Sequence, residues 1–94
     1  MDERLLKQSR VAESLLRDAA AELAAPQVLP GFERLICRSE FALALAELAT
    51  LGDAYPVSAE YWRLLEKTAE VLGLAVERKA FSMRYRAARS LEHT

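Results

Sequence analysis

Three features of the sequence predict an all-α fold, a compact bundle of four to five helices that forms a single domain over residues 1–94. Alanine and leucine dominate the composition, and glycine and proline number only three each. Few stretches alternate polar and apolar residues with a period of two, whereas apolar residues recur at helical spacing. A chain of 94 residues suffices for one core, although small domains are only marginally stable.

The first expected helix covers residues 2–25 and turns one apolar stripe toward the core. The members of this stripe are Leu5, Ala12, Leu16, Ala19 and Leu23. Pro26 is expected to end the helix, because proline disfavours helical geometry in the residue before it. Residues 27–31 are a predicted linker, and a short helical segment begins at Pro30. Cys37 near its end excludes an internal disulfide and is expected to be a small buried hydrophobe.

The central expected helix, residues 39–52, is apolar almost all round. Phe41, Leu45 and Leu48 share one face, while Leu43 and Leu51 lie off it. A helix of this kind is usually covered on more than one side, so it is expected to form the core. Ser39 is the predicted N-cap, with a break in the helix before it, and Gly52 the predicted left-handed stop. Glu40 and Glu47 lie on one line and mark the expected wet edge.

A fourth helix is predicted from an N-cap at Ser58 to about Leu72, with Gly73 as its left-handed stop. Trp62 lies at the margin of its apolar face, either partly in the core or as an anchor for a partner. Residues 74–91 fit both a helical stripe and the alternation of a strand, and the alanines and charge density favour a helix. The last residues are expected to be frayed.

The net charge of −1 conceals an acidic middle and a basic tail. Residues 40–77 carry a net charge of −5, and residues 78–94 carry +4. The tail interleaves Phe81 and Tyr85 with arginines, a pattern that could touch nucleic acid. Nucleic-acid binding is nevertheless disfavoured, because the whole chain gains little from phosphate attraction. The alternative is a packed helix whose arginines cover the acidic middle.

No pattern for catalysis, a cofactor or a metal is present. The sequence lacks a glycine-rich phosphate loop, an HExxH motif and paired cysteines, and its only histidine, His93, is next to the terminus. Asp2 and Glu3 occupy the place of the basic region of a signal peptide, so a cytoplasmic protein is expected. The longest uncharged run is far shorter than a membrane span. We therefore expect neither an enzyme nor a membrane partner.

The segments Ser39–Leu48 and Glu60–Leu74, joined by a turn with Pro56 and Ser58, resemble bacterial immunity proteins of the MafI type from polymorphic and contact-dependent toxin systems. The resemblance covers residues 33–74. It implies a compact helical protein that binds and blocks a cognate toxin domain, often a nuclease. An acidic surface would complement the basic cleft of a nuclease. The expected partner-binding residues are Glu40, Glu47, Asp53, Glu60, Trp62, Glu66 and Glu70.

Two alternatives of other classes remain open at this point. The chain could be a helical scaffold or homo-oligomeric protein without a toxin partner. It could also be a small nucleic-acid-binding regulator that uses the basic tail.

Overall fold

Five α-helices and no strand make up the part of the chain that the computed structural model describes, residues 3–23 and 29–92. The helices are α1 (Glu3–Ala21), α2 (Leu29–Cys37), α3 (Phe41–Ala54), α4 (Ala59–Leu72) and α5 (Ala75–Glu92). The predicted all-α class is confirmed, and so is helix rather than strand for the last segment. The predicted extent of the first helix is wrong: α1 ends at Ala21, where the Glu22 and Leu23 amides bond to carbonyls only three residues back, and α2 already begins at Leu29, inside the predicted linker. Pro26 and the chain end expected to be frayed lie outside the described residues.

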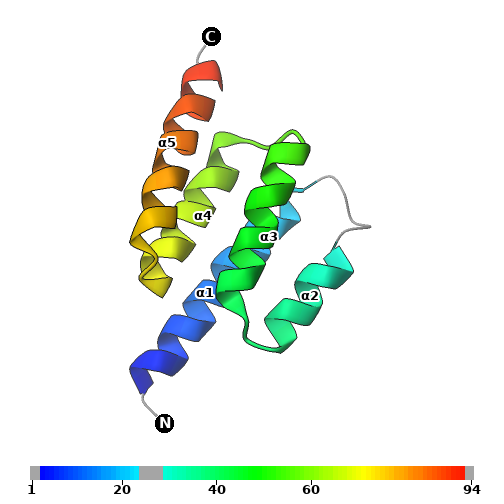
Figure 1. Cartoon of the computed structure of the whole chain (residues 1–94), viewed down its shortest axis with the longest axis vertical. Helices are drawn as coiled ribbons and strands as arrows, with labels where there is room; N and C mark the ends of the chain where they lie inside the picture. Colours follow the sequence, from blue (N-terminus) through cyan, green and yellow to red (C-terminus); the bar gives the residue numbers. More distant parts are fainter. Residues whose placement is uncertain (1–2, 24–28, 93–94) are drawn as a thin grey trace.

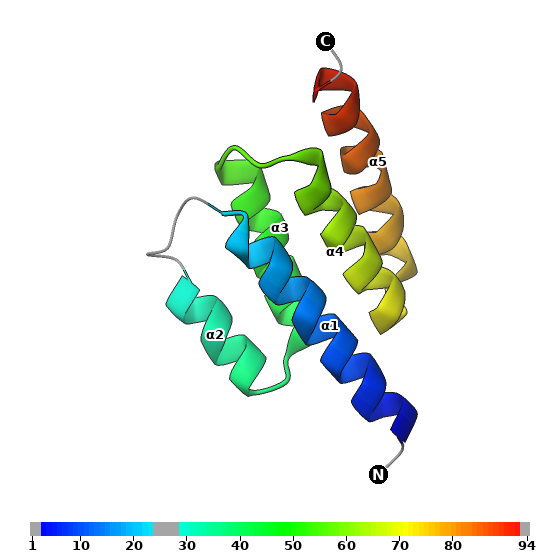
Figure 2. The same ribbon diagram turned by 180° about the vertical axis from the view of Figure 1, so that it is seen from behind.

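The helices α5, α4, α3 and α2 lie side by side in that order, and α1 crosses behind them (Figure 1). Seen from the other side, α1 runs over α3 and α4, and its first turns extend beyond the bundle (Figure 2). Helix α4 contacts α1, α3 and α5, whereas α5 packs mainly against α4. The core lies between α1, α3 and α4, with Leu16, Leu45, Leu48 and Leu65 fully buried.

Helix α1 turns its expected stripe inward, since Ala12, Leu16, Ala19 and Leu23 are all buried. Leu5, the first expected member, lies outside the side chains that the structure describes. Arg17 of α1 pairs with Glu33 of α2 at 2.6 Å, on the surface. The prediction for Cys37 is wrong: it is exposed at the last residue of α2, because Phe32 and Ile36 occupy the buried face of that helix.

The predicted break near Ser39 is confirmed, but both predicted ends of the central helix are wrong. Ser39 has a φ of 57° and lies in the link between α2 and α3, so Glu40 is the N-cap and makes no side-chain cap. The Glu40 amide instead donates to the Leu35 carbonyl at 2.9 Å. Gly52 is a buried residue inside α3, which continues to Ala54. This glycine is explained by packing rather than by a left-handed turn.

The predicted ends of α4 are confirmed in detail. The Ser58 hydroxyl oxygen accepts from the Tyr61 amide at 3.3 Å and donates to the Glu22 carboxylate at 2.6 Å. At the other end Gly73 has a φ of 72°, and the amides of Gly73 and Leu74 donate to the carbonyls of Glu70 and Ala69. This pair of bonds is a Schellman motif. These bonds satisfy backbone groups that a helix end leaves unpaired.

Candidate protein-binding surface

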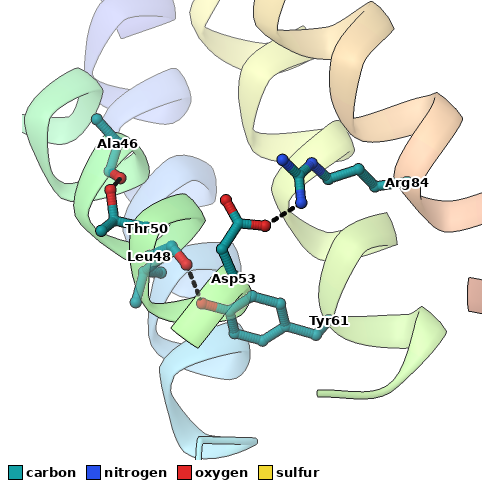
Figure 3. Close-up of polar contacts among 6 residues, drawn as sticks. All are labelled: Ala46, Leu48, Thr50, Asp53, Tyr61 and Arg84. Carbon is teal, nitrogen blue, oxygen red and sulfur yellow. Dashed lines mark hydrogen bonds and ion pairs between the residues drawn. The ribbon is translucent and has the colours of Figure 1, made fainter. Parts of the chain in front are cut away.

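The outward side of α3 is exposed and nearly free of charge. Its exposed residues, which we call the α3 surface, are Ala42, Leu43, Ala46, Glu47, Thr50 and Asp53. Leu43 is 57% exposed, although the sequence predicted cover on more than one side of this helix. The Thr50 hydroxyl donates to the Ala46 carbonyl at 3.1 Å, so its hydrogen is already used within the helix (Figure 3). An exposed leucine among methyl groups is suited to contact with another protein.

Helix α3 has this uncovered side because its neighbours occupy the other directions. Helix α2 lies on one flank, α4 lies on the other, and α1 lies behind (Figures 1 and 2). Leu45 and Leu48 fill the space toward these helices and are buried. Leu43 and Leu45 are two positions apart, so at about 100° per residue they point about 160° apart around the helix. It therefore points away from the core.

Carboxylates border the α3 surface on both flanks. Glu47 is exposed and lines a hollow of about 300 Å³ with Gly31, Leu35, Arg34 of α2 and Arg38 of the link that follows α2. Asp53, on the α4 side, pairs with Arg84 of α5 (Figure 3). Both partners in that pair are about half exposed, so the pair adds little to stability and leaves Asp53 accessible. No basic residue occurs within α3 itself.

The other expected acidic residues do not join this surface. Glu40 is half-buried at the start of α3, and Glu60 is exposed in the first turn of α4. Glu66 is half-buried. Glu70 lines a groove of about 610 Å³ between α1 and α4, together with Val11, Leu15 and Lys67. The acidic residues are therefore spread over several sides of the molecule.

Trp62 lies in the core instead of at an exposed margin. Only 6% of its surface is exposed, and its ring stacks on Phe81 at a centroid distance of 6.2 Å. Tyr61 meets it edge to face at 5.5 Å, and the Arg84 guanidinium lies 4.8 Å above it. Of the two roles expected for Trp62, the place in the core is confirmed, and it is buried more fully than its marginal position predicted because α5 covers it. Its indole offers almost no surface to a partner.

A close contact with Gly52 explains how Trp62 and Tyr61 fit beneath α3. A Cβ atom added at Gly52 would lie 2.7 Å from a Tyr61 ring carbon and 2.8 Å from a Trp62 ring carbon. The Tyr61 hydroxyl donates to the Leu48 carbonyl (Figure 3). Burial, with the Asp53 charge adding to it, raises the pKa of Tyr61 well above its ordinary value. This neutral hydrogen bond fixes the distance between α3 and α4.

The structure also brings together residues that the sequence did not single out. Arg63 of α4 and Arg89 of α5 both donate to the Tyr85 hydroxyl. Arg63 and Tyr85 are 22 positions apart, so only the packing of α4 on α5 could reveal their contact. The alternation of aromatic residues and arginines in the tail was the sole signal in the sequence.

Within the described residues, no group of histidine, cysteine or acidic side chains could hold a metal ion. None of the helices in that part of the chain is long and apolar enough to cross a membrane. Comparisons with protein-family models, curated proteins and solved structures found no match. The α3 surface and the resemblance of the two central segments to immunity proteins are therefore the two grounds for proposing a function.

Proposed function

We propose that this protein binds and neutralises a cognate toxin domain of a bacterial polymorphic toxin system, and that the α3 surface makes the central contact. The observation that carries the proposal is the exposure of Leu43 on the outward side of α3, beside exposed alanines and the carboxylates of Glu47 and Asp53. The resemblance of residues 33–74 to MafI-type immunity proteins supplies the class of partner.

The chemistry of the α3 surface suits a partner with basic residues around an apolar patch. Leu43 and the neighbouring alanines would exclude water at the centre, as the buried centre of an interface does. Glu47 and Asp53 would pair with lysines or arginines at the edge and speed association. A nuclease domain has such a basic surface, because it must attract phosphates.

The proposal predicts that the gene beside that of this protein encodes a large secreted protein with a variable C-terminal domain. The test expresses this C-terminal domain in bacterial cells, with and without the protein. We expect cells that contain both to survive, and the two purified chains to elute together as one complex. The control is an unrelated helical bundle of the same size at the same expression level. If the protein is folded but gives neither protection nor a complex, the proposed function is wrong. Self-association without a toxin complex would instead favour the homo-oligomeric alternative.

A further inference from the structure

Two arginines from different helices converge on one phenol where α4 and α5 pack together. Arg63 Nη1 and Arg89 Nη1 donate to the Tyr85 hydroxyl oxygen, at 3.2 Å and 2.7 Å. Their guanidinium carbons lie 5.5 Å and 6.0 Å from the centre of the Tyr85 ring, which is cation–π range. The two cations are thus held close together, with Tyr85 half-buried between them and both arginines exposed.

Among residues 3–23 and 29–92, neither of these arginines forms a direct ion pair. In the described part of the chain, the ion pairs of arginine belong to Arg17 and Arg84. Glu60 and Glu66 of α4 act on Arg63 only as charges at longer range. Glu92, the acidic residue in the last turn of α5, is occupied with the Ala59 amide at 2.8 Å. Two like charges repel one another, so an anion between them would be stabilised by both.

The Tyr85 hydroxyl shows that this position favours negative charge. Hydrogen bonds from Arg63 and then Arg89 lower the pKa of Tyr85 below its ordinary value. Its oxygen accepts both of these bonds, and no acceptor for its own hydrogen occurs among residues 3–23 and 29–92. Each arginine has further N–H groups beside the one that bonds Tyr85, and carboxylate oxygens accept hydrogen bonds from such donors.

We propose that Arg63, Tyr85 and Arg89 form a binding site for a carboxylate side chain in an acidic segment of a partner protein. Tyrosine and arginine are the residue types most enriched at the energetic centres of protein interfaces. The exposed position of the arginines suits contact between two protein surfaces. Glu60 and Glu66 lie near Arg63, so the site suits one carboxylate better than a long run of negative charges, and the experiment below compares a nucleic-acid strand with a peptide.

This site is independent of the proposed toxin contact. It involves α4 and α5 rather than α3, and it requires a partner group of the opposite charge. Consecutive residues of a helix point about 100° apart. Arg84 leans over Trp62 toward Asp53, so Tyr85 and its two arginines face another direction. The site can therefore exist whether or not the α3 surface binds a toxin.

The experiment titrates the protein with a short blocked peptide of alternating glycine and glutamate, and follows the arginine side-chain and Tyr85 ring resonances by NMR. We expect saturable shifts at Arg63, Tyr85 and Arg89. R89Q should weaken binding by about fivefold to tenfold, because a hydrogen-bonded charge is lost. R86Q is the matched control: it removes the same charge from an exposed position of α5 and should change the affinity by less than about twofold.

Three results would overturn the assignment. The first is an absence of shifts at the three residues. The second is an equal loss in R86Q and R89Q, which would indicate general attraction to a basic helix. The third is tighter binding of inorganic phosphate or of single-stranded oligothymidylate, each titrated in the same way. Y85F keeps the ring but removes the oxygen that accepts from both arginines. A measurable loss of affinity with an unchanged helical spectrum would support the site, and an unchanged affinity would exclude Tyr85 from it.

Discussion

Alanine and leucine occur on both sides of α3, yet one side is buried and the other is exposed. Ala44, Leu45 and Leu48 are buried against α1, α2 and α4, whereas Leu43 and Ala46 face outward. Composition therefore does not decide which side of an apolar helix belongs to the core; the positions of the neighbouring helices do. The difference is also the basis of the proposed function, since an uncovered apolar side of a helix can be covered by a partner.

The largest expected effect comes from the same substitution on the two sides. Leu45→Ala removes a side chain that is 1% exposed and should cost about 2–5 kcal/mol of unfolding free energy, because a cavity remains. Leu43→Ala on the outer side should cost less than about 0.5 kcal/mol. Urea denaturation of both variants measures this difference. Similar losses in the two variants would mean that the inner and outer sides have been assigned wrongly.

A pair of glycine substitutions tests how closely α4 approaches the inner side. Gly52→Ala places a methyl group against the rings of Tyr61 and Trp62 and should destabilise by about 1–3 kcal/mol through overpacking. Gly31→Ala in α2 is the control, since its added methyl meets nothing within 4 Å. Its better helix propensity should stabilise the protein by about 0.5–1 kcal/mol. Thermal unfolding should therefore show shifts of opposite sign, and a stabilising Gly52→Ala would contradict the close contact.

Alkaline pH should lower the unfolding free energy through Tyr61. Because burial raises the pKa of Tyr61, the unfolded chain loses that proton near pH 10 while the folded chain keeps it. The contribution of Tyr61 to the unfolding free energy is complete below about pH 10. It is lost by about 1.4 kcal/mol per pH unit as the pH rises from there toward the folded-state pKa of Tyr61. Tyr61→Phe should be less stable at neutral pH but should lose less stability above pH 10. Denaturation midpoints that fall equally steeply in both proteins would remove this role of Tyr61.

The sequence predicted what depends on local chemistry. The ends of α4 at Ser58 and Gly73 were correct, because a cap is formed by residues within one turn of it. The predictions for Ser39 and Gly52 failed because serine and glycine are common at helix ends but also occur elsewhere for other reasons. Ser39 lies in the link before α3, and Gly52 lies inside the helix. Gly52 is required by rings that lie nine and ten positions further along the chain. Only the packing of α3 on α4 reveals that requirement.

The candidate sites show the same division between local and tertiary information. The sequence indicated that Glu47 is on the surface, because it interrupts an apolar helix, and it placed the acidic Asp53 just beyond the predicted end of that helix. It could not show that Leu43 is exposed or that Trp62 is buried, since each depends on which helix lies alongside. The convergence of Arg63 and Arg89 on Tyr85 requires α4 and α5 to be packed together. That arrangement is a property of the fold rather than of any segment.

The most direct test of the α3 surface is toxin neutralisation by Leu43→Arg, with Val76→Arg as its matched control. Each variant adds one positive charge at an exposed apolar position, 57% exposed on α3 and 80% exposed on α5. Both should unfold at the same denaturant concentration as the unaltered protein. We predict that Leu43→Arg weakens toxin binding by about 2–4 kcal/mol and loses protection, because it places a cation at the centre of the contact, whereas Val76→Arg protects fully. Full protection by Leu43→Arg would show that the α3 surface does not make the contact with the toxin.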